Sequence, residues 1–146
     1  MTIIQRSALV PYAADAMYRL VNAIETYPQF MDGCVGAEIL SEDATQMEAR
    51  LDLAKAGMRY SFVTRNRLFP PQRIELTLIE GPFDKFGGEW TFQALQEHAS
   101  KVSLHLEFEM SSRLLGFAAR KVFDGIANQM VDALVKRAHS VYGTRP

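Results

Sequence analysis

One long amphipathic segment near the end of the chain constrains the fold more than any other stretch. Between Ser112 and Tyr142, apolar residues recur every three or four positions, the spacing of one face of an α-helix. These residues are Leu115, Ala119, Val122, Phe123, Ile126, Met130, Leu134, Ala138 and Val141. Ser112 is a suitable N-cap, and Gly143 marks the end. Such a helix of about 27 residues would be roughly 40 Å long, so it needs a large apolar surface to pack against.

The preceding sequence supplies that surface as strands. Residues 2–10 predict a strand, residues 13–24 a helix, and residues 25–36, which contain Pro28, a short helix or loop. Alternation with a period of two then predicts strands around residues 35–39, 47–53, 58–67, 74–78, 90–92 and 102–110. Gly81-Pro82 and Gly87-Gly88 are expected to bracket a loop that carries Phe83 and Phe86.

The widths of these elements predict how they pack. Successive hairpins indicate an antiparallel sheet, and about seven strands spaced about 4.8 Å apart are far wider than one helix of roughly 10 Å. The sheet must therefore curl around the helix, and small residues such as Ala127 on the helix leave room for apolar space between them. The predicted fold is α+β: a curved antiparallel sheet wrapped around a long C-terminal helix, with short helices between the first two strands.

Length and composition limit the classes of protein to consider. The 146 residues, 48% hydrophobic and with net charge −1, predict one domain over residues 1–146. This charge gives no overall attraction to nucleic acid, and no DNA partner is expected. A single cysteine, Cys34, excludes an internal disulfide framework and fits a reducing cytoplasm. No signal peptide or membrane-spanning run is recognised.

Several short motifs resemble one known family. They are Arg6-Ser7-Ala8, Val10-Pro11-Tyr12, Tyr27-Pro28-Gln29-Phe30 with Cys34, Gly81-Pro82-Phe83 and Gly88-Glu89-Trp90-Thr91-Phe92. Together with the long terminal helix, they resemble the START-like, helix-grip superfamily, in its branch of coenzyme Q-binding proteins and ribosome association toxins. The resemblance implies a helix-grip fold and three alternative functions. The first is a non-catalytic carrier of ubiquinone or another isoprenoid lipid that supports respiration. The second is a toxin that binds the large ribosomal subunit and blocks subunit association, and the third is an aromatase/cyclase-like enzyme. The carrier is the main expectation, and no required cofactor is expected.

Apolar side chains on the inner faces are the candidate ligand-binding residues. They are Tyr60, Phe62, Trp90, Phe92, Phe108, Phe123, Ile126, Met130 and Leu134. For most of them an ordinary core position is the better interpretation, although one helix should not fill the whole concavity of the sheet. A second group could form the mouth or lid of a pocket, or simply cap the sheet: Tyr27, Phe30, Leu68 and Phe69.

Four arginines flank the apolar tip of one predicted hairpin. They are Arg59, Arg65, Arg67 and Arg73, with no acidic residue between the first and the last. Such a surface suits an anionic membrane, such as the periphery of the inner membrane, or the phosphates of ribosomal RNA. The alternative is an ordinary solvated hairpin whose tip folds back on the protein.

Catalytic and metal-binding patterns are weak. His98, His105 and His139 are far apart in the sequence, and Cys34 has no neighbouring histidine or second cysteine. No catalytic residue and no metal ligand is therefore predicted.

Overall fold

The computed structural model describes residues 2–55, 57–111 and 116–143. Strand β1 (Thr2–Val10) leads into helix α1 (Ala14–Asn22) and the short 3₁₀ helix η1 (Ile24–Gln29). Six strands follow: β2 (Cys34–Glu42), β3 (Gln46–Lys55), β4 (Met58–Phe69), β5 (Arg73–Glu80), β6 (Phe83–Gln96) and β7 (Ala99–Met110). Helix α2 (Gly116–Tyr142) comes last. The predicted Ser112 cap and the stripe residue Leu115 lie outside the described residues.

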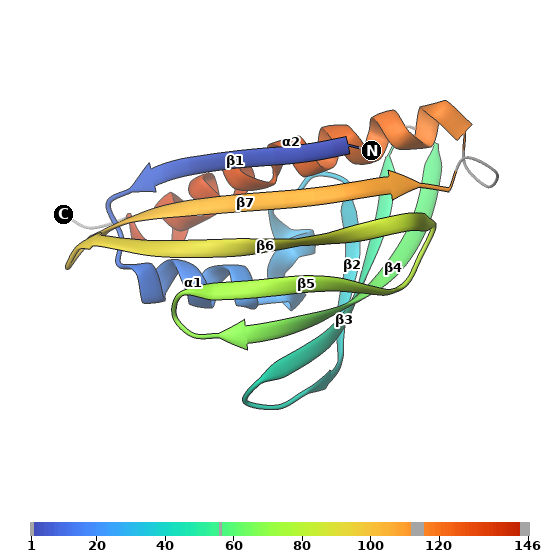
Figure 1. Ribbon diagram of the computed structural model, residues 1–146. Coiled ribbons are helices and arrows are strands. Elements are labelled where there is room, and N and C mark those ends of the chain that lie inside the picture. The colour runs from blue at the N-terminus through green and yellow to red at the C-terminus, as the bar shows by residue number, and fades with distance from the viewer. Residues whose placement is uncertain (1, 56, 112–115, 144–146) are drawn as a thin grey trace.

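The strands form one antiparallel sheet in the order β1-β7-β6-β5-β4-β3-β2. Strand β7 shows why they fold this way, because Val102, Leu104, Leu106, Phe108 and Met110 are buried while the residues between them are more exposed. Alternation places one face of each strand on the core. The sheet curls, so that β2, β3 and β4 turn away from the plane of β1, β7 and β6 (Figure 1).

Helix α2 packs along β1 and β7, and α1 packs on β6 and β7. Both helices lie on the inner side of the curved sheet (Figure 1). This arrangement confirms the predicted α+β helix-grip fold. None of the helices in the described part of the chain carries an apolar stretch long enough to cross a membrane.

The predicted loop around Gly87-Gly88 is wrong. Strand β6 runs without interruption from Phe83 to Gln96, and both glycines pair with β5 and β7. A Cβ on Gly88 would lie 2.1 Å from the carbonyl oxygen of His105. The glycine is therefore needed for close approach between β6 and β7 rather than for a turn.

An aromatic cluster fixes the N-terminal half of α2 to the sheet. The ring of Phe123 lies 4.7 Å from that of Phe108 and 5.0 Å from that of Phe83, measured between centroids. Phe62 and Phe86 complete the cluster at 5.9 Å and 6.3 Å from Phe123. These rings come from β4, β6 and β7, so one helical side chain contacts strands far apart in the sequence.

The C-terminal end of α2 is fixed by different contacts. The hydroxyl of Tyr142 donates to the carbonyl of Ala16 at 3.0 Å. Tyr12 and His139 form a hydrogen bond of 2.6 Å between the hydroxyl and Nδ1. The helix is therefore anchored at both ends, and its middle spans the inner side of the sheet.

We expect Phe123→Ala to lower the free energy of unfolding by about 3–5 kcal/mol, because it removes the ring at the centre of this cluster and leaves a cavity. Urea unfolding followed by circular dichroism measures the change. Val141→Ala, at a side chain that is 45% exposed, is the control and should change stability by no more than about 0.5 kcal/mol. Similar losses in the two variants would contradict the central role of the cluster.

Candidate functional site

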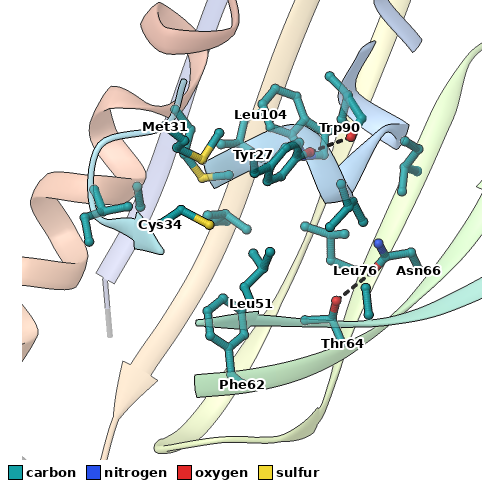
Figure 2. A pocket seen from close by; sticks show the side chains of 18 of the residues that line it. Tyr27, Met31, Cys34, Leu51, Phe62, Thr64, Asn66, Leu76, Trp90 and Leu104 are labelled. Atoms are coloured by element: carbon teal, nitrogen blue, oxygen red, sulfur yellow. Dashed lines mark hydrogen bonds between the residues drawn. The ribbon is translucent and has the colours of Figure 1, made fainter. Parts of the chain in front are cut away.

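A small apolar cavity lies between the middle of α2 and the inner face of the sheet. Its volume is about 60 Å³. Every element except β1 contributes to its wall, and Figure 2 shows the side chains converging on it. The lining residues are Val21, Asn22, Ile24, Tyr27, Met31, Cys34, Ala49, Leu51, Leu53, Phe62, Thr64, Asn66, Ile74, Leu76, Phe86, Trp90, Leu104, Leu106, Phe123, Ile126, Ala127 and Met130.

The size of the cavity limits what it can hold as it stands. Pockets for drug-sized ligands typically have volumes of about 300–1,000 Å³, so a quinone with an isoprenoid tail requires the wall to move. Met31 and Met130 are part of that wall, and the unbranched side chain of methionine adapts its shape readily. The cavity is therefore an apolar site that must widen to accept a large molecule.

A polar pair interrupts this apolar wall. The hydroxyl of Thr64 donates to Oδ1 of Asn66 at 2.8 Å, and both side chains are buried. They are neighbours on the inward face of β4 (Figure 2). The sequence argument did not single out Asn66, although it continues the alternating series that includes Phe62 and Thr64.

The titratable residues of the wall stay neutral near pH 7. Tyr27 is buried and donates its hydroxyl to the carbonyl of Val21, and burial raises its pKa well above the usual value for tyrosine. Burial also raises the pKa of the Cys34 thiol, which donates to the carbonyl of Gly36. Neither group is therefore prepared for acid–base work at neutral pH.

The candidate ligand-binding residues divide into two groups. Phe62, Trp90, Phe123, Ile126 and Met130 line the cavity. Phe92, Phe108 and Leu134 are buried core residues outside its wall, and Tyr60 lies near Phe123 but also outside the wall. The alternation of apolar residues in the sequence shows which side chains of a strand face inward. It does not show which of these side chains border the cavity.

The candidate lid residues are also dispersed. Tyr27 lines the cavity, whereas Phe30 lies outside it, with the guanidinium of Arg137 5.2 Å from its ring centroid. Leu68 and Phe69, at the end of β4, do not line the cavity.

A larger groove adjoins the cavity on the outside. It has a volume of about 610 Å³ and lies between α2 and residues 29–32. Met31 and Ile126 line both spaces, so their side chains form a shared wall. Gly33 packs behind this wall, because a Cβ on it would lie 2.7 Å from Cδ1 of Ile126. A displacement of this wall would join the two spaces.

The arginines of the predicted hairpin face acidic partners on neighbouring strands. Arg65 contacts Glu48 at 2.7 Å, and Arg73 contacts Glu75 at 2.9 Å and Glu89 at 3.7 Å. Arg67 lies 3.5 Å from Glu75. This surface is therefore mixed in charge rather than purely basic.

Arg59 stands apart from that group, near Asp52. A hydrogen bond from Ser61, together with the charges of Arg50 and Arg59, keeps the pKa of Asp52 below its usual value.

The tip of the hairpin presents an aromatic ring between two cations. The guanidinium carbons of Arg67 and Arg73 lie 5.4 Å and 4.7 Å from the ring centroid of Phe69. Within the described residues, no group of three or more His, Cys, Asp or Glu side chains is arranged to hold a metal ion.

Comparison with known proteins places the chain in a family. The family described as polyketide cyclase / dehydrase and lipid transport matches residues 10–135. The chain belongs to this family. Among curated proteins, the Ribosome association toxin RatA of Escherichia coli is 44% identical over 142 residues, covering 97% of this chain and 90% of that protein. The mitochondrial coenzyme Q-binding protein homolog B of Xenopus laevis is 24% identical, covering 94% of this chain and 58% of that protein.

A solved structure shows the same fold. The Zhui aromatase/cyclase from a Streptomyces species superposes with a TM-score of 0.79 at 20% identity, covering 94% of this chain and 93% of that one. At this identity the similarity concerns the fold alone. Different activities occur on one scaffold, so the family leaves the function to be argued from the sites.

The phenol of Tyr60 gives a test of the core beside the cavity. Its hydroxyl is buried without a partner among the described residues, and burial raises its pKa to about 12. The unfolded chain ionises at a tyrosine pKa of about 10. Tyr60 therefore contributes stability that is fully present below about pH 10 and is lost as the pH rises towards 12.

We expect Tyr60→Phe to leave stability at pH 7 unchanged or slightly higher, and to make the loss of stability above pH 10 less steep, because no hydrogen bond is removed. Urea unfolding between pH 7 and pH 11 measures both effects. A loss of more than about 1 kcal/mol at pH 7 would show that the hydroxyl has a partner.

Proposed function

We propose that this protein controls ribosome association by binding the large ribosomal subunit. The observation that carries this proposal is the 44% identity to a Ribosome association toxin RatA along 97% of the chain and 90% of the relative. Because the similarity covers both proteins almost from end to end, it includes the outer surfaces as well as the core.

The exposed end of the β4–β5 hairpin is the surface that we assign to this contact. Arg67 is more exposed than Arg65 and Arg73, with 62% of the side chain accessible, and its ion pair with Glu75, at 3.5 Å, is longer than the shortest ion pair of either. Exposed ion pairs contribute little to stability, so an RNA phosphate can replace the glutamate at low cost. The ring of Phe69 between Arg67 and Arg73 adds a surface on which an unpaired base can stack.

We expect the double variant Arg67→Gln/Arg73→Gln to bind purified large subunits more weakly, and the slope of log affinity against log salt concentration to become less steep by about 2. Sedimentation binding at several salt concentrations measures both quantities. Lys85→Gln is the matched control, because Lys85 is exposed at the start of β6, at the other end of the sheet from the hairpin.

Equal affinities and slopes in the two variants would contradict the assignment of the hairpin. A native protein that neither binds large subunits nor increases free subunits in sucrose gradients would contradict the proposed function itself.

A second candidate function is the transport or storage of an apolar molecule such as a quinone. The apolar cavity favours it, because transfer of apolar ligand surface from water contributes about 25 cal/mol per Å². The description of the family includes lipid transport, and the Xenopus relative is named as a coenzyme Q-binding protein. The two functions use different surfaces, one outside and one inside the sheet, and do not exclude each other.

We expect Ala127→Leu to weaken the binding of a short-chain ubiquinone at least about tenfold, because Ala127 is 1% exposed and lines the cavity that the larger side chain would fill. Fluorescence titration and mass spectrometry of extracted lipids measure binding. Val141→Leu, at an exposed position of the same helix that lines neither the cavity nor the groove, should bind as the native protein does. The absence of saturable binding to the native protein would contradict this second function.

A further inference from the structure

The Thr64–Asn66 pair is the main polar feature that the functions above do not use. Asn66 is 3% exposed and Thr64 8%, in a wall made mostly of apolar side chains. The residues paired with Asn66 on the adjacent strands are Met47 and Leu76, which are both apolar. The amide is therefore held in an environment that offers it few polar neighbours.

The two polar atoms of the Asn66 amide differ in their contacts. Oδ1 accepts the hydrogen bond from Thr64, which fixes the orientation of the side chain. The hydrogen bond found for this side chain among the described residues is the one to Oδ1, and Figure 2 shows the amide nitrogen turned toward the interior of the cavity. An amide nitrogen carries two donors, so this side chain keeps hydrogen-bonding capacity that a molecule in the cavity can use.

Asn22 is a second residue of the cavity wall with a side-chain polar atom that makes no hydrogen bond within the described residues. Its Oδ1 is buried without a partner in the described part of the chain, and Asn22 lines the same cavity from the end of α1. A buried acceptor without a partner is costly, and an entirely apolar wall would avoid this cost. The retained amides point to a ligand with polar atoms of its own.

We propose that Asn66 recognises the carbonyl oxygen of an otherwise apolar small molecule bound in the cavity. The amide nitrogen donates to the carbonyl, while Thr64 holds the amide in place. A carboxylate does not fit, because the described residues that line the cavity include no lysine, arginine or histidine to compensate its charge. The proposal rests on the cavity as a ligand site, the second function above, and is independent of ribosome binding.

Three probes of nearly equal shape test the chemistry: acetophenone, which carries a carbonyl; ethylbenzene, which carries no polar group; and 1-phenylethanol, which carries a hydroxyl. Binding to the purified protein is followed by NMR of ¹³C-labelled methionine methyl groups. Met31 and Met130 line the cavity and report on it, whereas Met58 does not line it and serves as an internal reference.

We expect the native protein to bind acetophenone about fivefold more tightly than ethylbenzene, the effect of one hydrogen bond. Asn66→Leu should abolish this preference. Gln93→Leu, which removes an exposed amide on β6 that does not line the cavity, is the matched control and should retain it. The double variant Thr64→Val/Asn66→Leu, which leaves no unpaired partner behind, replaces the single variant if that one unfolds, and should likewise show no preference.

Three results would overturn the proposal. One is the absence of any shift of the Met31 and Met130 signals with all three probes. Another is an unchanged preference for acetophenone after substitution of Asn66, which would make the Thr64–Asn66 pair purely structural. The third is an Asn66-dependent preference for 1-phenylethanol over acetophenone, which would mean that the amide presents its oxygen rather than its nitrogen to the ligand.

Discussion

The structure depends on the contact between one narrow helix and a much wider sheet. Phe123 anchors α2 to rings from β4, β6 and β7, and Tyr12 and Tyr142 anchor its other end. Between these anchors the helix presents Ala127 to the interior. Because both ends are fixed and the middle is small, the helix cannot move inward to fill the space beneath it. The cavity therefore results from the fixed ends of α2 and the small side chain between them.

Curvature separates the two surfaces on which function can depend. The inner face of the sheet carries the cavity and its Thr64–Asn66 pair. The outer residues of the same strands carry exposed charges, with Arg65 on Glu48 and Arg73 on Glu75. Alternation along β4 places Arg65 and Arg67 outside and Asn66 inside. A single strand therefore contributes to both candidate sites, although their chemistry differs completely.

Strict alternation made much of this fold predictable from the sequence, and β7 is the clearest example. The prediction was wrong at β6, because Gly87-Gly88 has the composition of a turn, and the need for a glycine beside His105 becomes visible only once β6 and β7 are paired. The mixed charge of the hairpin surface was hidden for the same reason, since Glu48 and Glu89 come from other strands. Asn66 was predictable from the alternation, because it follows Phe62 and Thr64 on the inward face of β4, but its polar side chain does not match the apolar pattern by which inner faces are recognised.

The chemistry of the wall limits the proton transfers that its described side chains can support. General acid–base catalysis needs a group whose pKa is near the working pH. The titratable side chains that line the cavity are Tyr27 and Cys34, and burial raises the pKa of both above their usual values. Both are held by hydrogen bonds to backbone carbonyls, those of Val21 and Gly36. The described wall can therefore desolvate and orient a molecule, but it offers no side chain suited to proton transfer at neutral pH.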